Sequence, residues 1–327
     1  MSALITADWH LSDLPRDAYR HVMIAKLPAL AKQQQARQAI VLGDLTELKD
    51  RHSAALVNQV VGHVAALAKV VEAVYVSRGN HDYVDINNPY YAFLKHIPNV
   101  RWINQPSGVK LEGIGRCLFL PHTTNHERDW DEFDFEMHRY VLAHNTFEGA
   151  VGDNGRRLDG VPLSVFPKGV RVISGDVHVP QKLGPVTYVG APYTIDFGDD
   201  YEPRALLLAA KGFESLPLSG PQKRLLEAPC DAPADGINPG DIVKVRVSID
   251  REDMERWAEI RDKWRAWGSK RGFIIHTVEP LLTTHVPGSP KASRRKASKR
   301  DDGELLDAFG KASGVDDRTM RLGHKLM

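Results

Sequence analysis

Five short segments of this 327-residue chain each place metal-competent side chains directly after a predicted strand. Carboxylate, carboxamide and imidazole groups together suit Mn²⁺, Fe²⁺ or Zn²⁺. Side chains at strand ends gather at one edge of a sheet, where loops are free to aim them. The pattern therefore predicts a divalent-metal site built from Asp8-Trp9-His10, Gly43-Asp44, Gly79-Asn80-His81-Asp82, Ala143-His144-Asn145 and Gly175-Asp176-Val177-His178.

The chemistry that needs such a set is hydrolysis of a phosphoester. Two cations roughly 3.5–4 Å apart can clamp the attacking and leaving oxygens. A carboxylate between the cations holds such a pair together, and Asp44 is the natural candidate. A histidine that is not a ligand can protonate the leaving oxygen, and His81 suits that role. Each motif alone could be an ordinary turn, but turns do not explain five of them in order at strand ends.

Short apolar runs alternate with helical stretches over the first two hundred residues, which favours two packed sheets flanked by helices. Helices are expected at 19–38 and 53–69. Strands are expected at 3–7, 39–42, 70–76, 116–120, 140–143, 170–174 and 187–189.

The pattern changes toward the C-terminus. A strand at 241–249, an amphipathic helix at 253–271 and a strand at 273–278 predict a small βαβ module, in which Trp257, Trp264 and Trp267 share a packing face. We therefore expect a catalytic domain at 1–210, a second domain at 211–282, a basic linker at 283–303 and a helical tail at 304–327.

The composition limits the partners and the cellular location that we expect. Lys and Arg number 43 against 42 Asp and Glu, so net charge indicates no partner. Two cysteines, Cys117 and Cys230, are too few for a disulfide framework and favour a reducing interior. There is no signal-peptide pattern and no run of eighteen apolar residues. We expect no membrane association and a cytoplasmic location, in a host cytoplasm if the chain is phage-encoded.

The ordered motifs resemble those of the calcineurin-like metallophosphoesterases over residues 1–210. The resemblance implies an α/β fold, a four-layer α-β-β-α sandwich. It implies one metal held by Asp8, His10 and His178, with His81 as the catalytic histidine. A second metal would be held by Asn80, His144 and Asp176, with Asp44 bridging the two. The family usually has His where this chain has Asp176, and a carboxylate is an acceptable ligand for Mn²⁺.

Two further stretches look like those of the SbcD nucleases, namely His178-Val179-Pro180-Gln181 and Tyr188-Val189-Gly190-Ala191-Pro192. The resemblance implies a DNA nuclease with 3′→5′ exonuclease action and single-strand endonuclease action. The βαβ module would be a capping domain that helps to bind DNA. The cofactors would be two divalent ions, Mn²⁺ first, with Mg²⁺, Fe²⁺ and Zn²⁺ as alternatives. The partners would be a second copy of the chain and an SbcC-type coiled-coil ATPase bound through the tail.

Three residues near the motifs are candidate substrate contacts: Glu47, His52 and Arg78. Glu47 would orient the substrate strand, and the other two would face phosphate. Two other functions stay open. One is a phosphatase or cyclic-nucleotide phosphodiesterase that uses the same metals. The other is a DNA-end-binding scaffold subunit with a weakened metal site, which the change from His to Asp at 176 would favour.

Overall fold

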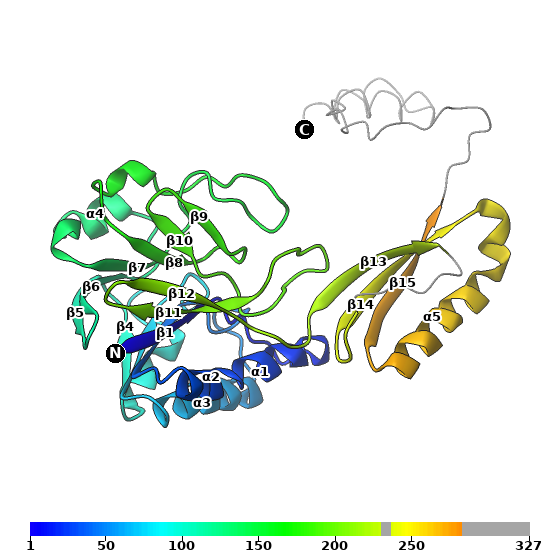
Figure 1. The fold of residues 1–327 in the computed structure, drawn as a ribbon, viewed down its shortest axis with the longest axis horizontal. Coiled ribbons are helices and arrows are strands. Elements are labelled where there is room, and N and C mark those ends of the chain that lie inside the picture. The colour runs from blue at the N-terminus through cyan, green and yellow to red at the C-terminus, as the bar shows by residue number, and fades with distance from the viewer. Residues whose placement is uncertain (230–236, 283–327) are drawn as a thin grey trace, which may run out of the picture. The chain divides into compact units, whose positions relative to one another are not determined.

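Two six-stranded sheets pack face to face in the computed structural model, which describes residues 1–229 and 237–282 (Figure 1). The first sheet has the order β12-β11-β1-β2-β3-β4, and β1 to β4 run parallel. Its strands are β1 (Ser2–Ala7), β2 (Gln38–Leu42), β3 (Ala73–Ser77), β4 (Val100–Ile103), β11 (Arg204–Ala209) and β12 (Gly212–Pro217).

The second sheet has the order β5-β6-β7-β8-β10-β9, and β6, β7, β8 and β10 run parallel. Its strands are β5 (Ser107–Leu111), β6 (Gly115–Leu120), β7 (Tyr140–His144), β8 (Val172–Gly175), β9 (Gln181–Leu183) and β10 (Val186–Tyr188). The central strands of both sheets are buried along their length, as parallel strands covered on both faces must be.

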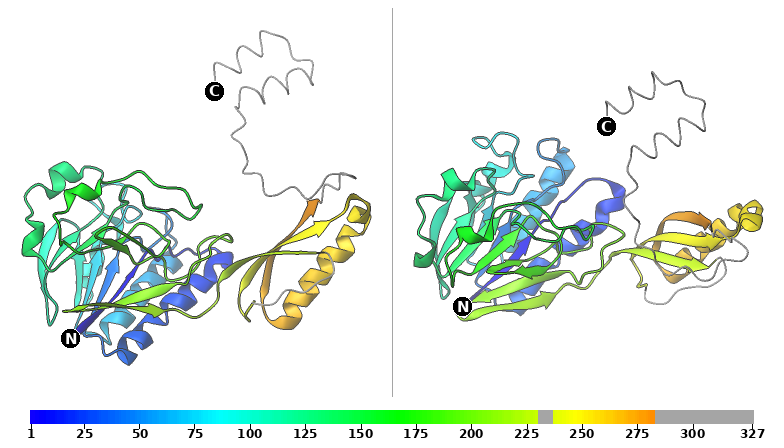
Figure 2. Two further views of the ribbon diagram at one scale, coloured as in Figure 1. Left: turned by 45° about the horizontal axis from the view of Figure 1, so that its top comes forward. Right: turned by 90° about the horizontal axis from the view of Figure 1, so that it is seen from above.

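Three apolar clusters account for the layers. Ile5 and Ile40 of the first sheet meet Phe119 and Leu142 of the second in the cluster between the sheets. A second cluster joins the other face of the first sheet to α1 (Ala18–Ile24), α2 (Leu27–Gln33) and α3 (Ala54–Ala68), which Figure 2 also shows together. The third lies beyond the second sheet, where α4 (His126–Trp130) contributes Trp130. The predicted α/β sandwich is confirmed.

Four 3-10 helices complete this part of the chain, and they are η1 (Pro15–Asp17), η2 (Tyr90–His96), η3 (Phe135–Met137) and η4 (Leu163–Val165). The single helix expected over 19–38 is instead two short ones. Pro28 lies in the first turn of α2, where its missing N–H is tolerated, so the helix restarts there. Gln35 then adopts a left-handed φ of 51°, which ends α2 before β2 begins.

The C-terminal module has a parallel three-stranded sheet of order β13-β14-β15. Its elements are β13 (Lys223–Pro229), β14 (Ile242–Ile249), η5 (Arg251–Arg256), α5 (Trp257–Arg271) and β15 (Ile274–Leu282). Trp264 is buried against β14, and Trp257 and Trp267 pack around it, as the helical spacing predicts. Gly272 ends α5 with a φ of 81°.

One boundary and one element differ from expectation. β12 pairs with β11 through a hairpin, so the sandwich extends to Pro217 and the boundary expected after residue 210 falls inside that hairpin. β13 supplies a third strand to the module, which the sequence pattern did not predict. The basic linker at 283–303 and the tail at 304–327 lie outside the described residues. Within residues 1–229 and 237–282, no helix is both long and apolar enough to cross a membrane.

Candidate metal centre

The predicted ligands leave parallel strands that lie side by side in each sheet. β1, β2 and β3 are neighbours in the first sheet, and β7 and β8 are neighbours in the second. The sheets approach closely at these ends, because a Cβ atom at Gly175 would lie 2.5 Å from the carbonyl oxygen of Leu42. The seven residues brought together are Asp8, His10, Asp44, Asn80, His144, Asp176 and His178.

Asp8, His10 and His178 form one group, with donor atoms within 4.8 Å of one another. The Nε2 atoms of His10 and His178 are 3.1 Å apart. Asp8 is fully buried, and within the described residues its Oδ2 has no hydrogen-bond partner, while Oδ1 accepts from the Asp176 amide at 2.9 Å. A buried carboxylate oxygen without a partner is costly. A cation shared with the two imidazoles would satisfy it.

Asn80 is the centre of a second group that consists almost wholly of acceptors. Its amide oxygen lies 2.9 and 3.1 Å from the two carboxylate oxygens of Asp44 and 3.2 Å from Asp176 Oδ1. It is also 3.1 Å from His144 Nε2. Turning the amide would place its NH₂ among these atoms. The orientation with the oxygen inward is the one that a cation would favour, because oxygen and imidazole nitrogen then converge on a positive charge.

Asp44 faces both groups. Its Oδ2 lies 3.4 Å from His10 Nε2, and its Oδ1 lies 3.4 Å from His144 Nε2. Asp44 is 1% exposed, so its carboxylate has little access to water. This is the placement that a bridging ligand requires. The donor set therefore fits two divalent cations, one beside His10 and the other beside His144.

The backbone is strained where it supplies these ligands. Asp and His at positive φ are uncommon, and the left-handed region costs a residue with a Cβ roughly 1–2 kcal/mol. Such outliers cluster at functional sites. The ligand candidates with positive φ are Asp8 at 54°, His10 at 38°, Asp44 at 56° and Asp176 at 79°.

Burial and mutual charge shift the ionisation of this cluster in opposite directions. Burial raises the pKa of Asp8 to about 7, although His144 and His178 act to lower it. Burial also acts to raise the pKa of Asp44, but His144 and His10 outweigh it and hold that pKa below its usual range. Burial acts to lower the pKa of His144, but Asp44 raises it well above 6.5. The buried charges are thus tightly interdependent, as in a site made to neutralise cations.

The family model for calcineurin-like phosphoesterases matches residues 1–180. The chain belongs to the calcineurin-like phosphoesterase family. The family assignment makes it a metal-dependent hydrolase of phosphoesters, in agreement with the donor groups above. Among curated proteins, no sequence matches the chain.

Several solved structures resemble this phosphoesterase. The phosphoesterase YfcE from E. coli is 17% identical with a TM-score of 0.33, over 64% of this chain and 88% of that one. A dimetal phosphatase from Danio rerio is 10% identical with a TM-score of 0.39, over 67% and 99%. The nuclease MPE from Pseudomonas putida is 21% identical with a TM-score of 0.29, over 65% and 87%. TM-scores in this range leave the family assignment to the sequence model.

The three imidazoles predicted to be ligands are oriented in different ways through Nδ1. His144 Nδ1 donates to the carbonyl oxygen of Leu42, which turns Nε2 toward Asp44. His178 Nδ1 lies 2.8 Å from the carboxylate of Asp153. Among the described residues, His10 Nδ1 has no hydrogen-bond partner. Such outer contacts fix the tautomer of a metal-binding histidine.

His81 lies beside the ligands. Its amide donates to Asp44 Oδ1 at 2.8 Å, and its ring packs edge-on against His10 with centroids 4.8 Å apart. Its Nδ1 is 2.6 Å from the carbonyl oxygen of Glu47, so Nδ1 carries the proton and Nε2 is the nitrogen left for chemistry. This geometry suits a proton donor to substrate. The role itself stays a prediction, because His81 also falls within one of the groups of potential ligands.

The three predicted substrate contacts are placed differently. Glu47 Oε2 accepts from Arg20 at 2.8 Å and lies 3.7 Å from His10 Nδ1, so it faces a ligand ring. His52 packs on the Tyr90 ring, with centroids 4.2 Å apart, ahead of α3. It is the neighbour of the capping Ser53.

Arg78 differs from expectation most clearly, because it is only 2% exposed. It donates to the carbonyl oxygen of His122 at 2.8 Å and lies over the Tyr83 ring at 4.4 Å. Facing the interior, it joins two loops and is not placed to meet a phosphate.

Two residues that shape the site were assigned no role from the sequence. Asp82 is fully buried and accepts from the amides of Asp44, Leu45 and Gly79 at 2.9, 3.0 and 2.7 Å. Asp82 is the last residue of the third motif, but the sequence pattern assigned it no role. Arg20, which donates to the carbonyl oxygen of His10, lies in a helix with no motif around it.

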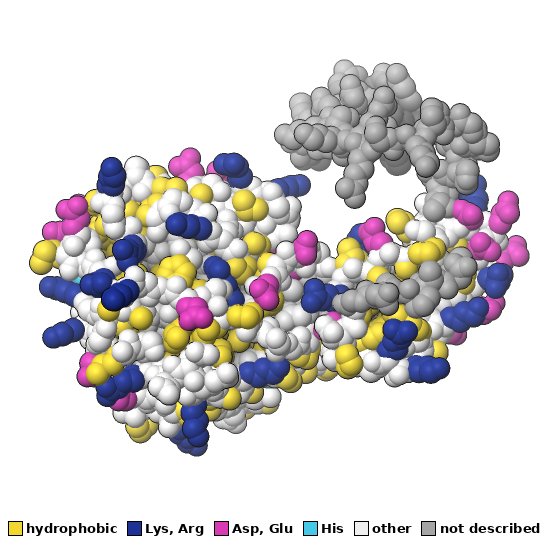
Figure 3. Space-filling view, viewed as in Figure 1, with side chains coloured by type: hydrophobic (Ala, Val, Ile, Leu, Met, Phe, Trp, Pro, Cys, Tyr) yellow, Lys and Arg dark blue, Asp and Glu magenta, His cyan; other side chains and the backbone are white. Residues whose placement is uncertain are grey.

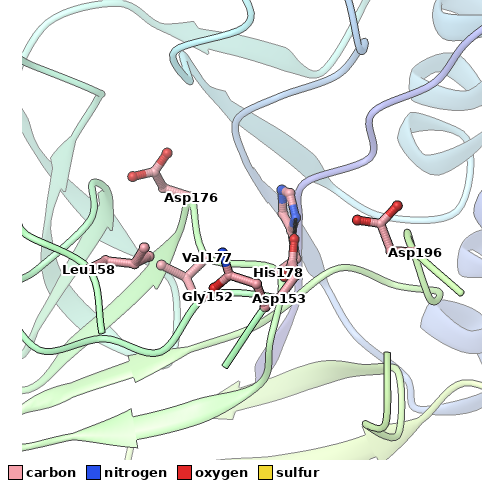
Figure 4. A pocket seen from close by; sticks show the side chains of 8 residues that line it. Gly152, Asp153, Leu158, Asp176, Val177, His178 and Asp196 are labelled. Carbon is pink, nitrogen blue, oxygen red and sulfur yellow. Dashed lines mark hydrogen bonds and ion pairs between the residues drawn. The ribbon is translucent and has the colours of Figure 1, made fainter. Parts of the chain in front are cut away.

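Two cavities flank the ligands. One, of about 400 Å³, is lined by the carboxylates of Asp153, Asp176 and Asp196, by His178 and by their neighbours (Figure 4). The other, of about 520 Å³, is lined by Asn80, Asp176, His122, His126 and by threonines and other residues. The second cavity carries one carboxylate against three in the first. It is the less repulsive side for a phosphate group.

Proposed function

We propose that this phosphoesterase is a two-metal DNA nuclease with Mn²⁺ as its working metal. The observation that carries the proposal is the gathering of seven donor residues, with Asp44 between the two groups and His81 hydrogen-bonded to Asp44 beside them. A two-metal site of this kind fits an in-line displacement at a phosphodiester. The complete donor set argues against a scaffold with a decayed site.

The preference for DNA among phosphodiesters rests on the resemblance to the SbcD nucleases. The stretch from His178 to Gln181 supplies a ligand and, through Gln181, a contact to the neighbouring loop. The module of β13–β15 and α5 follows the catalytic domain, as the capping domain does in that family. Figure 3 shows Lys and Arg spread over its visible face among acidic and apolar side chains. The proposed DNA binding therefore depends on the site and the module, and not on a charged patch on this face.

The protein's own groups have separable tasks. When bound, the two cations would offset the negative charge of the phosphate and activate water for attack. Protonated on both ring nitrogens, His81 would donate its Nε2 proton to the leaving oxygen and return to the neutral imidazole, while Nδ1–H keeps its hydrogen bond to the Glu47 carbonyl. The cavity beside Asn80 and Asp176 would receive the strand. Homodimerisation and binding of an SbcC-type ATPase through residues 304–327 are further proposals from the same resemblance.

The test is cleavage of labelled single- and double-stranded DNA with Mn²⁺, with Mg²⁺ or with EDTA, by the wild type and His81→Ala. A matched control is His96→Ala, because His96 is exposed and has no contact with the site. We expect Mn²⁺-dependent cleavage that His81→Ala abolishes and His96→Ala leaves unchanged. Metal content, measured by elemental analysis, should be the same in all three proteins, and loss of metal from His81→Ala would reassign that residue as a ligand.

The rival functions give different results in the same experiment. Turnover of mononucleotides or cyclic nucleotides without DNA cleavage would indicate a phosphatase or a cyclic-nucleotide phosphodiesterase. DNA binding without hydrolysis of any phosphoester would indicate a scaffold subunit. Removal of residues 302–327 should leave basal cleavage intact and prevent any ATPase complex. An unchanged complex on gel filtration would refute that role for the tail.

A further inference from the structure

The side chain of Asp153 brings the segment between β7 and β8 back to the metal centre. Short bridges join Phe147 to Val161 and Val151 to Arg157, so the segment folds back on itself. Asp153 lies in the turn that connects the two arms, and its carboxylate is 2.8 Å from His178 Nδ1 (Figure 4). None of the metal-binding motifs includes Asp153. Its contact is with a predicted ligand, not with a predicted cation.

Gln181 holds this segment in place. The amide of Val151 donates to Gln181 Oε1 at 2.8 Å, and Gln181 Nε2 donates to the carbonyl oxygen of Val151 at 2.7 Å. Two hydrogen bonds in opposite directions fix both the position and the orientation of the backbone there. Asp153 follows two residues later. The glutamine of the His178-to-Gln181 stretch thus has a structural task that the proposed reaction does not use.

A carboxylate and a carbonyl affect a ligand imidazole differently. Both accept the Nδ1 proton and fix the ring, but a carboxylate also carries charge and raises the basicity of the ligating nitrogen. His178 has the carboxylate of Asp153, whereas His144 has the neutral carbonyl oxygen of Leu42. The difference separates the two groups of donors, because His178 belongs with Asp8 and His10, and His144 belongs with Asn80.

We propose that Asp153 is a positioning residue that selectively strengthens the cation site of Asp8, His10 and His178, and that Gln181 delivers it. The proposal rests on the two-metal site but not on DNA as the substrate. Asp153 keeps 26% of its side chain exposed and faces the cavity of about 400 Å³. The contact can therefore be removed without opening the buried core of either sheet.

The test titrates Mn²⁺ into metal-free protein and measures both dissociation constants by calorimetry, with free Mn²⁺ followed by electron paramagnetic resonance. In Asp153→Ala, one of the two constants should rise about 10–100-fold while the other stays unchanged. Asp153→Asn keeps an acceptor for Nδ1 but loses the charge, so its increase should be smaller. Asp159→Ala is the control, because Asp159 is an exposed carboxylate on the same segment. It should leave both constants unchanged.

Gln181→Ala tests the delivery. It should weaken the same site less than Asp153→Ala does, and the double variant should bind no more weakly than Asp153→Ala alone, because Gln181 acts through Asp153. Fully additive losses would refute the tether. Thermal unfolding without metal should give similar melting temperatures for all variants. Should Asp153→Ala fail to fold, Asp153→Asn carries the test.

Two failures are distinguishable. A wild type that binds fewer than two ions would remove the two-metal site and with it the proposed function. A wild type that binds two ions, with both constants unchanged in Asp153→Ala and Asp153→Asn, would overturn the role of Asp153 alone.

Discussion

Substitution of Asp82 should loosen the metal centre without touching a ligand. The Asp82 carboxylate is fully buried, with Oδ2 accepting from the amides of Asp44 and Gly79 and Oδ1 accepting from the amide of Leu45. These amides belong to the turns that follow β2 and β3. One side chain therefore ties together the two turns that present Asp44 and Asn80.

The magnitude follows from the number of donors that lose an acceptor. Asp82→Ala leaves three buried amides unpaired, at about 1–2 kcal/mol each, which gives a loss of about 3–6 kcal/mol. Asp82→Asn keeps one oxygen for two amides and turns an NH₂ toward the third, so its loss should be about 2 kcal/mol. Burial raises the pKa of Asp82. Removing that buried charge offsets part of the loss in Asp82→Asn.

Urea unfolding in EDTA, followed by tryptophan fluorescence, measures these losses without a contribution from bound metal. Asp85→Ala is a matched control, because Asp85 also accepts a backbone amide but lies in an exposed turn. Its loss should stay below about 1 kcal/mol. A loss of unfolding free energy below about 1 kcal/mol in Asp82→Ala would refute the predicted stabilisation. Retention of both metals by Asp82→Ala in the absence of EDTA would refute the predicted loosening of the metal centre.

Three further predictions concern the same domain. Asp44→Ala should lose both metals and all activity, because Asp44 faces both groups, and two ions retained by elemental analysis would contradict bridging. Gly43→Ala should lower the affinity for the ion beside His144, because Gly43 has a φ of 79° and a Cβ atom there would lie 2.4 Å from His144 Nδ1. An unchanged dissociation constant in a metal titration would contradict this. Burial and His21 lower the pKa of His63 to about 4, so the unfolded chain binds this proton first and stability falls as pH drops from about 6.5 through 4. Allowing for its half-exposed ring, unfolding free energies of wild type and His63→Gln at pH 7 and 4.5 should diverge by about 1–2 kcal/mol, and parallel curves would rule out His63 as the source.

The strand-end motifs could be found in the sequence because each ligand is local to a buried strand. β1, β2 and β7 begin and end within two residues of expectation, since their apolar runs are continuous. Short edge strands such as β4 and β9 carry no comparable run, and their pairing depends on neighbours distant in sequence. The sequence could therefore predict the central sheet positions but not the edges.

The residues that orient the ligands were harder to find for a related reason. Asp153 reaches His178 from 25 positions away, and Arg20 reaches Glu47 from 27. Pairs so far apart along the sequence produce no periodic pattern from which the contact could be predicted. Arg78 shows the converse case: an arginine beside a motif suggests phosphate binding, whereas the fold buries its side chain against the Tyr83 ring.

The left-handed backbone conformation of the predicted ligand residues has a consequence for protein engineering. Asp8, Asp44 and Asp176 occupy backbone positions where glycine would rest without strain. Glycine there would abolish a predicted ligand and relieve strain, but at positions 8 and 44 it would also leave the amides of Asp176 and His81 without their acceptor, so the two effects on the free energy of unfolding oppose each other. Alanine would sacrifice the ligand and keep the strain. A search for thermostable variants should therefore monitor catalysis whenever it samples these positions.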